Sequence, residues 1–323
     1  MTAPPTTEGF AAQDVILVGG EALYDLVLDG TEELRAHPGG GPFNTARTIG
    51  RLQQPVAYLG RVSTDRFGRT LERILADDGV HLDAVVYTEQ PTTLALAEID
   101  DEGVAKYRFY EQGTSAPGLT PDAALAALPP AVGILHVGTL GMTLEPMATA
   151  LEAVVEKLAG GALVALDPNC RPSMITDPDG YRRRLRRLLG RSHLVKVSEE
   201  DLAWLDPHRP PVAAGRALLE QGSAVALVTR GPLGAVVVTP DEEISVPAPP
   251  IDLVDTIGAG DAFSGGFLAW WRSQGLGPDD LRRLDVVVEA TRFACLVAAR
   301  TCERAGASPP HLSELEPVRP HLP

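Results

Sequence analysis

The sequence is poor in cysteine, which limits how the fold can be held together. Its 323 residues include only three cysteines, Cys170, Cys295 and Cys302. They form no CxxC pair, and no histidines follow them at the spacing of a zinc site. A chain of this length can bury a large core without disulfides or metals. We therefore expect a reducing compartment and no structural zinc.

Positive charge is also scarce. The chain has 28 lysines and arginines against 43 aspartates and glutamates, a formal net charge of −15. We therefore expect neither nucleic acid nor an anionic membrane as a partner, because both would be repelled. One basic cluster, residues 182–191, departs from this balance. Leucines recur in it at helical spacing, which favours a helix with a buried edge and a solvated arginine face; a phosphate-binding patch is the alternative.

Long apolar runs and two common nucleotide motifs are missing. No stretch reaches the roughly 20 apolar residues that cross a bilayer. Residues 1–13 lack the basic start and apolar core of a signal peptide, so we expect a cytoplasmic protein. No GxxxxGK[ST] occurs, and the GAG at residues 258–260 cannot complete GxGxxG because Phe263 stands at the third position. P-loop proteins and nicotinamide-dependent oxidoreductases are thereby excluded.

Short apolar runs alternate with amphipathic stretches along most of the chain. The predicted strands are residues 15–18, 56–59, 133–137, 162–166, 194–197 and 225–229, and helix-like stretches include residues 69–76, 151–158 and 212–220. Runs without polar alternation are typical of strands buried on both faces of a parallel sheet. The pattern predicts a doubly wound α/β fold, with a mostly parallel sheet and helices on both faces.

Two segments break this rhythm. Residues 94–99 and 105–110 flank an acidic turn at residues 100–103 that ends in glycine, a pattern that predicts a β-hairpin. We interpret the hairpin as part of a small β flap, or lid, built from segments 23–36 and 91–115.

No internal repeat or low-complexity linker divides the chain. We predict one domain over residues 13–310. The flanking residues 1–12 and 311–323 are predicted to be loosely ordered tails, the second of them rich in proline.

The most informative segment is a glycine-rich stretch, residues 255–266, in front of an apolar helical pattern. A glycine-rich turn that opens a helix leaves backbone N–H groups unpaired, and the helix dipole adds positive potential. Such a turn suits a transferring phosphoryl group. We predict that Gly258, Ala259 and Gly260 form it, with the amides of Ala259, Gly260 and Asp261 facing the charge.

Asp261 needs a separate reason, because a carboxylate beside a phosphate repels it. It could act as the general base that takes the proton from a hydroxyl as that oxygen attacks the γ-phosphate. It could equally cap the helix, as aspartate often does.

Two motifs together carry a family resemblance. The heptad DTIGAGD at residues 255–261 resembles the signature of the PfkB carbohydrate kinases, in the ribokinase-like superfamily. GGGPFN at residues 39–44 resembles the family's GGxxxN, and residues 60–68 resemble its GxVGxDxxG run with the second glycine missing. The sequence is identified as a member of this family from residue 15 to about 307, and it resembles the fructokinase branch.

The resemblance implies a set of sugar or phosphate contacts: Asp25, Gly40, Gly41, Asn44, Arg108, Asn169 and Arg171. A carboxylate such as Asp25 that accepts two hydroxyls suits a polyol. Asn169 and Arg171 belong to a DPNCR stretch at the end of a predicted strand, where open α/β sheets bind ligands. As alternatives, Asp25 and Asp167 could be turn residues and Asn44 a helix-start residue.

The resemblance also implies an ATP site. Its predicted nucleotide contacts are Lys196, Ser198, Thr229, Arg230, Gly231, Gly234, Gly258, Gly260 and Cys295. TRGPLG at residues 229–234 resembles the family's TxGxxG loop, although a plain hairpin turn is the alternative. Cys295 stands where the family usually has asparagine.

Metal use is implied with one departure. The family's NxxE motif appears as Ser198-Glu199-Glu200-Asp201, so Asp201 is the candidate Mg²⁺ residue, acting through water. The resemblance further implies a monovalent cation, such as K⁺, near Asp255.

The expected activity is transfer of the ATP γ-phosphoryl group to a hydroxyl of a small sugar, with fructose as the first choice. Ribose, 2-keto-3-deoxygluconate and a nucleoside stay open. So does a sugar phosphate, whose recognition would use cations near the lid: Arg35, His37, Lys106 and Arg108. A non-catalytic sugar-binding regulator is the rival from another class. Pairing of two copies through their lids is a further expectation from the family.

Overall fold

The main sheet dominates the architecture. The computed structural model describes residues 14–28, 34–99 and 105–315. Within these ranges nine strands form one sheet, in the spatial order β13 (Glu243–Val246), β12 (Ala235–Val238), β11 (Val225–Thr229), β10 (Leu194–Ser198), β9 (Leu163–Asp167), β8 (Val132–Gly138), β1 (Val15–Gly19), β4 (Val56–Ser63) and β5 (Val85–Thr88). Strands β11, β12 and β13 pair antiparallel, and the other neighbours pair parallel. The predicted mostly parallel sheet is confirmed.

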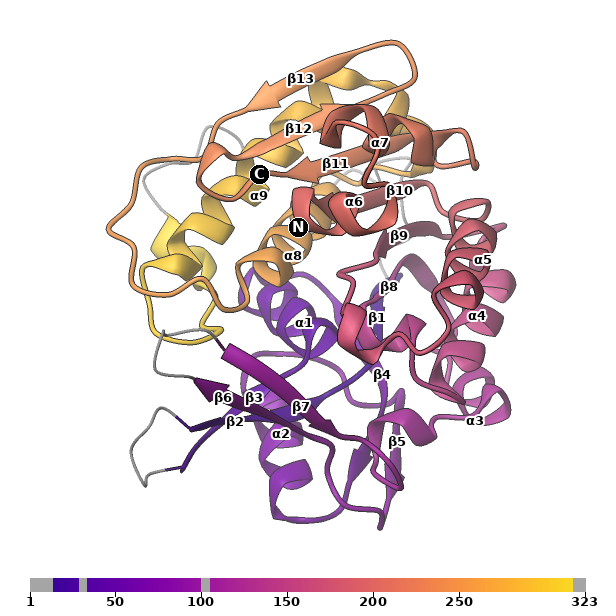
Figure 1. Ribbon diagram of the computed structural model, residues 1–323, viewed down its shortest axis with the longest axis vertical. Coiled ribbons are helices and arrows are strands. Elements are labelled where there is room, and N and C mark those ends of the chain that lie inside the picture. Colours follow the sequence, from indigo (N-terminus) through magenta and orange to yellow (C-terminus); the bar gives the residue numbers. More distant parts are fainter. Residues whose placement is uncertain (1–13, 29–33, 100–104, 316–323) are drawn as a thin grey trace, which may run out of the picture.

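Helices cover both faces of this sheet (Figure 1). One layer consists of α1 (Gly41–Arg51), α2 (Arg66–Asp77), α8 (Ala259–Ser273) and α9 (Leu284–Cys302). The other consists of α3 (Pro121–Ala126), α4 (Met147–Leu158), α5 (Pro178–Leu189), α6 (Glu199–Leu205) and α7 (Pro211–Leu219). Side chains of β1 alternate between them: Ile16 and Val18 pack with the first layer, and Leu17 with the second. All three are fully buried, which explains why the strand runs are continuously apolar.

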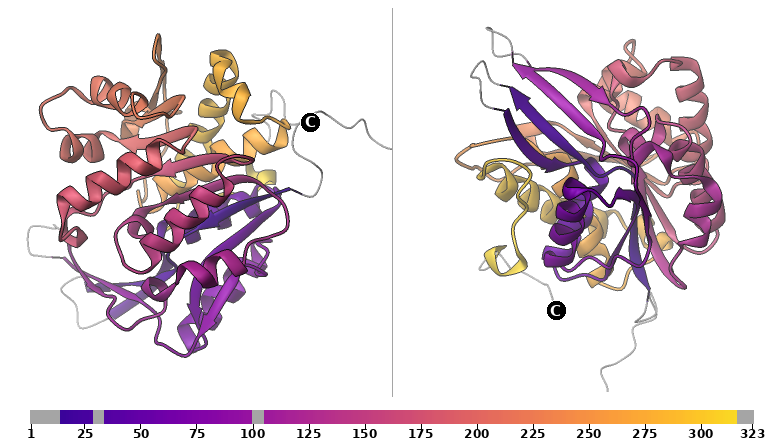
Figure 2. Two further views of the ribbon diagram at one scale, coloured as in Figure 1. Left: turned by 90° about the vertical axis from the view of Figure 1, so that its right-hand side faces the viewer. Right: turned by 90° about the horizontal axis from the view of Figure 1, so that it is seen from below.

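A second, smaller sheet forms the lid. Its four strands within the described residues lie in the order β3 (Leu34–Gly39), β2 (Leu23–Leu28), β6 (Leu94–Ile99) and β7 (Ala105–Tyr110). Strands β6 and β7 pair antiparallel, so the predicted hairpin is confirmed, and β2 joins β6 in parallel. The turn at residues 100–103 lies outside the described residues. Figure 2 shows the strands of this sheet projecting away from the main body.

The beginning of the predicted C-terminal tail is not loose. Residues Leu312–Leu315 form the short 3₁₀ helix η6, and Leu315 is 3% exposed. It packs in a cluster with Leu52, Ala262 and Val297. The prediction is therefore wrong for residues 311–315, because two leucines one turn apart cover an apolar patch on α8 and α9. Residues 1–12 and 316–323 lie outside the described residues.

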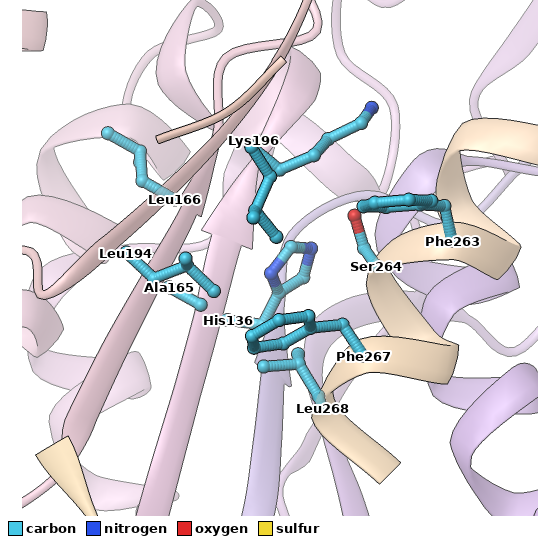
Figure 3. A pocket seen from close by; sticks show the side chains of 10 residues that line it. His136, Ala165, Leu166, Leu194, Lys196, Phe263, Ser264, Phe267 and Leu268 are labelled. Carbon is cyan, nitrogen blue, oxygen red and sulfur yellow. The ribbon is translucent and has the colours of Figure 1, made fainter. Parts of the chain in front are cut away.

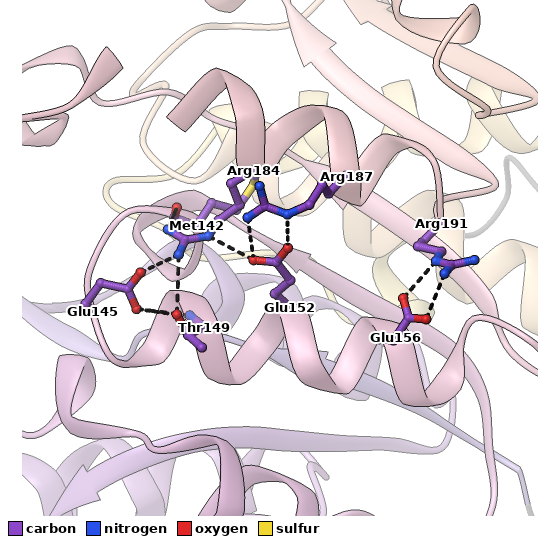
Figure 4. A network of polar contacts seen from close by, with 8 residues as sticks. All are labelled: Met142, Glu145, Thr149, Glu152, Glu156, Arg184, Arg187 and Arg191. Atoms are coloured by element: carbon purple, nitrogen blue, oxygen red, sulfur yellow. Dashed lines mark hydrogen bonds and ion pairs between the residues drawn. The ribbon is translucent and has the colours of Figure 1, made fainter. Parts of the chain in front are cut away.

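The basic cluster is a solvated helix face, as predicted. Arginines of α5 and of the turn after it pair with glutamates of α4, including Arg187 with Glu152 and Arg191 with Glu156 (Figure 4). Arg184 also pairs with Glu152. Since glutamates already neutralise these arginines, the structure does not favour a phosphate-binding patch there. No helix in the described part of the chain is both long and apolar enough to cross a membrane.

Candidate active site

The ends of several main-sheet strands converge beside two helix N-termini. Asp167 ends β9 and Ser198 ends β10, while α1 and α8 begin at Gly41 and Ala259. Because β1, β8, β9 and β10 are parallel neighbours, their carboxyl ends meet at the same edge of the sheet. Asp167, Ser198 and the glycine-rich turn, which the sequence singled out, lie along this edge.

The glycine-rich turn opens α8 as predicted. Gly258 is the N-cap residue, with a left-handed φ of 76° that favours glycine. The N–H of Ala259 donates to the carbonyl of Thr256 at 3.2 Å. Ala259 is therefore engaged within the turn, and the amides of Gly260 and Asp261 are the better candidates for holding an anion at this helix start.

Asp261 does not cap the helix. It lies in the first turn, after the N-cap Gly258, and its side chain is turned toward α1. The Nδ2 of Asn44 donates to Asp261 Oδ2 at 2.9 Å, and the Thr45 hydroxyl donates to the Asp261 carbonyl at 3.3 Å. Burial raises the pKa of Asp261 to about 6, and the charge of Asp167 adds to the shift. The capping interpretation is wrong, and a carboxylate with this pKa can exchange a proton near neutral pH.

A buried ion pair lies next to the glycine-rich turn. Lys196 Nζ donates to Asp167 Oδ2 at 3.0 Å, and the Ser264 hydroxyl donates to the same oxygen at 3.3 Å. Burial would lower the pKa of Lys196, but the neighbouring carboxylates hold it above its ordinary value, so the ammonium stays charged. Lys196 Nζ also lies 3.0 Å from where a Cβ on Gly260 would be. The ammonium therefore stands directly behind the start of α8.

A small cavity lies beside Lys196 (Figure 3). It measures about 10 Å³ and is lined by His136, Lys196 and Ser264 among mainly apolar side chains. Burial and the charge of Lys196 lower the pKa of His136 to about 3, so the imidazole is neutral. A space of this size holds about one water and no substrate.

Arg171 connects two other predicted sugar contacts: its charge acts on Asp25, and its side chain is hydrogen-bonded to Asn169. Burial raises the pKa of Asp25 to about 6, while His37 and Arg171 lower it. Arg171 also lowers the pKa of Asp261, so one guanidinium acts on both carboxylates. Its NH1 donates to Asn169 Oδ1 at 2.6 Å. Asn169 has a φ of 37°, a left-handed conformation that asparagine adopts more readily than most other residues with a side chain.

Other predicted contacts are placed differently. Gly40 is the N-cap residue of α1, followed by Gly41 as its first residue, so both lie at the convergence of strand and helix ends. Arg108 lies on the lid strand β7 with an exposed side chain. Cys295 is 4% exposed inside the apolar cluster between the sheet and α9, and burial raises its pKa to about 11. The structure therefore does not favour Cys295 as a nucleotide contact, because its thiol belongs to the core.

The TRGPLG segment forms a hairpin loop between β11 and β12. Thr229 pairs with Ala235 across the two antiparallel strands, and the Arg230 N–H donates to the Gly234 carbonyl at 2.8 Å. The 3₁₀ helix η4 (Gly231–Leu233) stands at its tip with exposed residues. The hairpin interpretation is confirmed for the backbone, and the loop's exposure leaves it free to lie against a ligand.

Asp201 is occupied by protein contacts. Its Oδ2 accepts from the N–H and hydroxyl of Ser198 at 3.0 and 2.8 Å, forming a capping box at the start of α6. Its Oδ1 accepts from the Cys170 N–H at 2.6 Å, and the residue is 5% exposed. A buried carboxylate with both oxygens engaged does not fit a direct Mg²⁺ ligand.

Asp255 precedes the glycine-rich turn and is hydrogen-bonded to two backbone amides. Its Oδ1 accepts from the Ile257 N–H at 3.0 Å, and its Oδ2 accepts from the Gly306 N–H at 2.8 Å. Each oxygen of a carboxylate keeps a second lone pair. Asp255 is partly exposed, so its carboxylate can be reached from solvent.

The sequence reasoning missed two residues at this edge, Glu21 and Thr139. Both are buried, and they are hydrogen-bonded to each other across 118 positions in the chain. A carboxylate directly after a buried strand is the signal that could have singled out Glu21, since few glutamates are buried without a partner. Thr139 carries no such signal.

The comparisons with known proteins decide the family. The model of the "pfkB family carbohydrate kinase" matches residues 14–314. The chain belongs to the pfkB family of carbohydrate kinases. Among the pfkB relatives it resembles, the fructokinase of Klebsiella pneumoniae is 33% identical over 310 residues, which cover 93% of this chain and 98% of that protein.

Solved structures of fructokinases share the fold. The fructokinase of Xylella fastidiosa with bound ATP matches with a TM-score of 0.84 and 28% identity, over 93% of this chain and 96% of that one. A fructokinase double mutant from Vibrio cholerae O395, with fructose, ADP and potassium ion bound, matches with a TM-score of 0.80 and 25% identity, over 93% and 95%. The ribokinase-like fold predicted from the sequence is confirmed.

Proposed function

We propose that this pfkB protein is an ATP-dependent fructokinase, in which Asp261 is the general base. The observation that carries the proposal is the placement of Asp261. Its carboxylate is buried in the first turn of α8, has a pKa raised to about 6, and is held by Asn44. The fructokinases among its relatives support the choice of substrate.

The proposed reaction is in-line transfer of the γ-phosphoryl group to a sugar hydroxyl. The sugar oxygen attacks phosphorus while Asp261 takes the hydroxyl proton, and the bond to the leaving ADP oxygen breaks. The amides of Gly260 and Asp261, at the positive end of α8, and the Lys196 ammonium oppose the negative charge of the transferring group. Positioning and electrostatics thus supply most of the rate enhancement.

The sugar would lie between the lid and the main sheet. Asp25 on β2 is the proposed acceptor of sugar hydroxyls, with Gly40, Gly41 and Asn44 at the start of α1 beside it. Arg171 would neutralise charge between the two carboxylates, since it lowers the pKa of both.

The nucleotide would lie on the side of the glycine-rich turn opposite the sugar. The hairpin loop at residues 229–234, whose tip Gly231–Leu233 is exposed, is its proposed support. The related fructokinase of Xylella fastidiosa has been solved with bound ATP, and that of Vibrio cholerae with ADP and a potassium ion. We propose Asp255 as the residue that holds the monovalent cation. Divalent metal in kinases neutralises phosphate charge, but Asp201 does not fit as its direct ligand.

The experiment is a coupled assay of ADP release with ATP against a panel of acceptors: fructose, ribose, 2-keto-3-deoxygluconate, fructose 6-phosphate and adenosine. We expect a strong signal with fructose, accompanied by one equivalent of fructose phosphate per ADP. A strong signal with another acceptor alone would overturn fructose and keep the kinase. ATP binding without turnover on any acceptor would favour a sugar-binding regulator.

A further inference from the structure

Glu21 is a buried carboxylate that joins three separate segments. It follows β1 and is 2% exposed. Its Oε1 accepts from the Gly41 N–H at 3.3 Å and from the Thr139 hydroxyl, and its Oε2 accepts from the Gly141 N–H at 3.2 Å. Gly41 opens α1, and the other two donors belong to the 3₁₀ helix η2 (Thr139–Met142) after β8. One side chain therefore ties the start of α1 to the end of the central sheet.

The segment held by Glu21 lies between the two carboxylates of the proposed sugar site. A Cβ on Gly41 would meet Asp261 Oδ1 at 3.2 Å and the Thr139 methyl at 2.5 Å. A Cβ on Gly39 would meet Asp25 Oδ2 at 2.1 Å. The three glycines 39–41 thus touch Asp25 at one end and Asp261 at the other, with no room for a larger residue at either end.

The buried Glu21 carboxylate and the backbone conformation of Thr139 both cost free energy, which argues for a functional reason. Burial raises the pKa of Glu21 to about 7, although hydrogen bonds from Thr139, from its own backbone and from Gly41 lower it, and the charge of Asp261 adds to the rise. Thr139 has a φ of 55°, a strained conformation for a β-branched residue. Strain and buried charge of this kind persist where the surrounding structure must hold one geometry.

We propose that Glu21 is a positioning residue that fixes the glycine segment 39–41 between Asp25 and Asp261 and thereby sets the affinity for the sugar. An apolar side chain cannot accept these hydrogen bonds. Glutamine presents an amide nitrogen to one of the donors, so it cannot satisfy all three. The effect on sugar affinity rests on the proposed function, whereas the hold on the glycine segment does not.

The first test measures hydrogen exchange, which needs no substrate. In Glu21→Gln we expect amides of residues 39–46 to exchange at least about tenfold faster, because glutamine cannot accept hydrogen bonds from all three donors. Exchange in α9 serves as the internal reference. Tyr58→Phe is the matched control: the Tyr58 hydroxyl donates to the Gly20 carbonyl at 2.7 Å, equally buried and next to Glu21, but it does not touch the glycine segment.

A second variant keeps the test decisive if Glu21→Gln unfolds. Thr139→Val removes one donor and nearly preserves volume, so a smaller acceleration over the same residues is expected. Unchanged exchange at residues 39–46 in both variants, or equal acceleration in Tyr58→Phe, would show that Glu21 does not fix the glycine segment.

The second test compares the KM for sugar with the KM for ATP. In Glu21→Gln we expect the KM for sugar to rise about tenfold or more. The KM for ATP should stay within about twofold, and Tyr58→Phe should change neither. An equal rise in both KM values would indicate a general structural role and overturn the proposal. If the wild-type protein has no sugar kinase activity, the proposed function and the effect on sugar affinity are both refuted. The exchange data would still show whether Glu21 fixes residues 39–41.

Discussion

Two clusters of charge in this protein differ above all in how far their ion pairs are exposed to water. Beside the glycine-rich turn, Lys196 and Asp167 pair with side-chain exposures of 8% and 2%, next to the buried Asp261. Between α4 and α5, Arg187 and Glu152 pair with exposures of 57% and 26%. In the first cluster the charges are desolvated, and in the second they remain in water.

Desolvation decides what each cluster can do. Exposed ion pairs contribute little to stability, because water and salt screen them and two long side chains lose freedom. Buried charges oppose folding unless they are paired, and they interact strongly with any new charge that enters the site. The buried cluster therefore suits chemistry at some expense of stability. The row of ion pairs between arginines of α5 and glutamates of α4, which we call the ladder, keeps a helix face soluble.

The sharpest way to separate the two clusters is Asp261→Asn. We expect kcat to fall by about 10²–10⁴-fold, because the amide cannot take the proton of the attacking hydroxyl. Arg187→Ala, on the ladder, should leave kcat unchanged. The measurement is the coupled assay with fructose and saturating ATP. Wild-type activity in Asp261→Asn would remove Asp261 from the mechanism.

Breaking the buried pair should affect folding more than breaking any exposed pair. Lys196→Met leaves Asp167 without its cation, and we expect the free energy of unfolding to drop by about 3–5 kcal/mol. Adding Asp167→Asn to that variant should restore part of the loss, because no uncompensated charge remains. Urea unfolding followed by circular dichroism measures both. If Lys196→Met is as stable as the wild type, water already compensates the charge of Asp167 and the prediction is wrong.

The buried charge of Asp261 should also be visible in stability as a function of pH. Its pKa rises from 3.8 to about 6 on folding, so its ionisation opposes folding, and stability is lost as the pH rises through 6. At pH 8 we expect Asp261→Asn to be more stable than the wild type by roughly 1–3 kcal/mol. The difference should shrink toward pH 5. Urea unfolding at the two pH values tests this, and a gain that grows toward pH 5 would contradict the sign.

The smallest effect is expected at the ladder itself. Arg187→Ala should lower the free energy of unfolding by only about 0.2–1 kcal/mol, and the difference should decrease in high salt. Thermal unfolding at low and high salt checks it. A loss as large as that of Lys196→Met would show that exposure does not distinguish the two clusters.

Much of the fold could be predicted from the sequence because its signals are local. The continuous apolar run at residues 15–18 and the alternation along the chain predicted the parallel sheet, and the glycine-rich stretch before Ala262 and Phe263 predicted the start of α8. Local patterns could not show that Leu315 packs on α8 and α9, because its apolar partners are distant in the chain.

The sequence by itself determined the layered α/β architecture, the lid hairpin and the glycine-rich start of α8, since each depends on residues within one segment. Only the tertiary structure decided how the charges are used. It turned Asp261 toward Asn44, engaged Asp201 in a capping box, buried Cys295 in the core, and joined Glu21 to Gly41. These roles depend on desolvation and on hydrogen bonds between distant segments, and both arise only when the strand ends and helix starts meet.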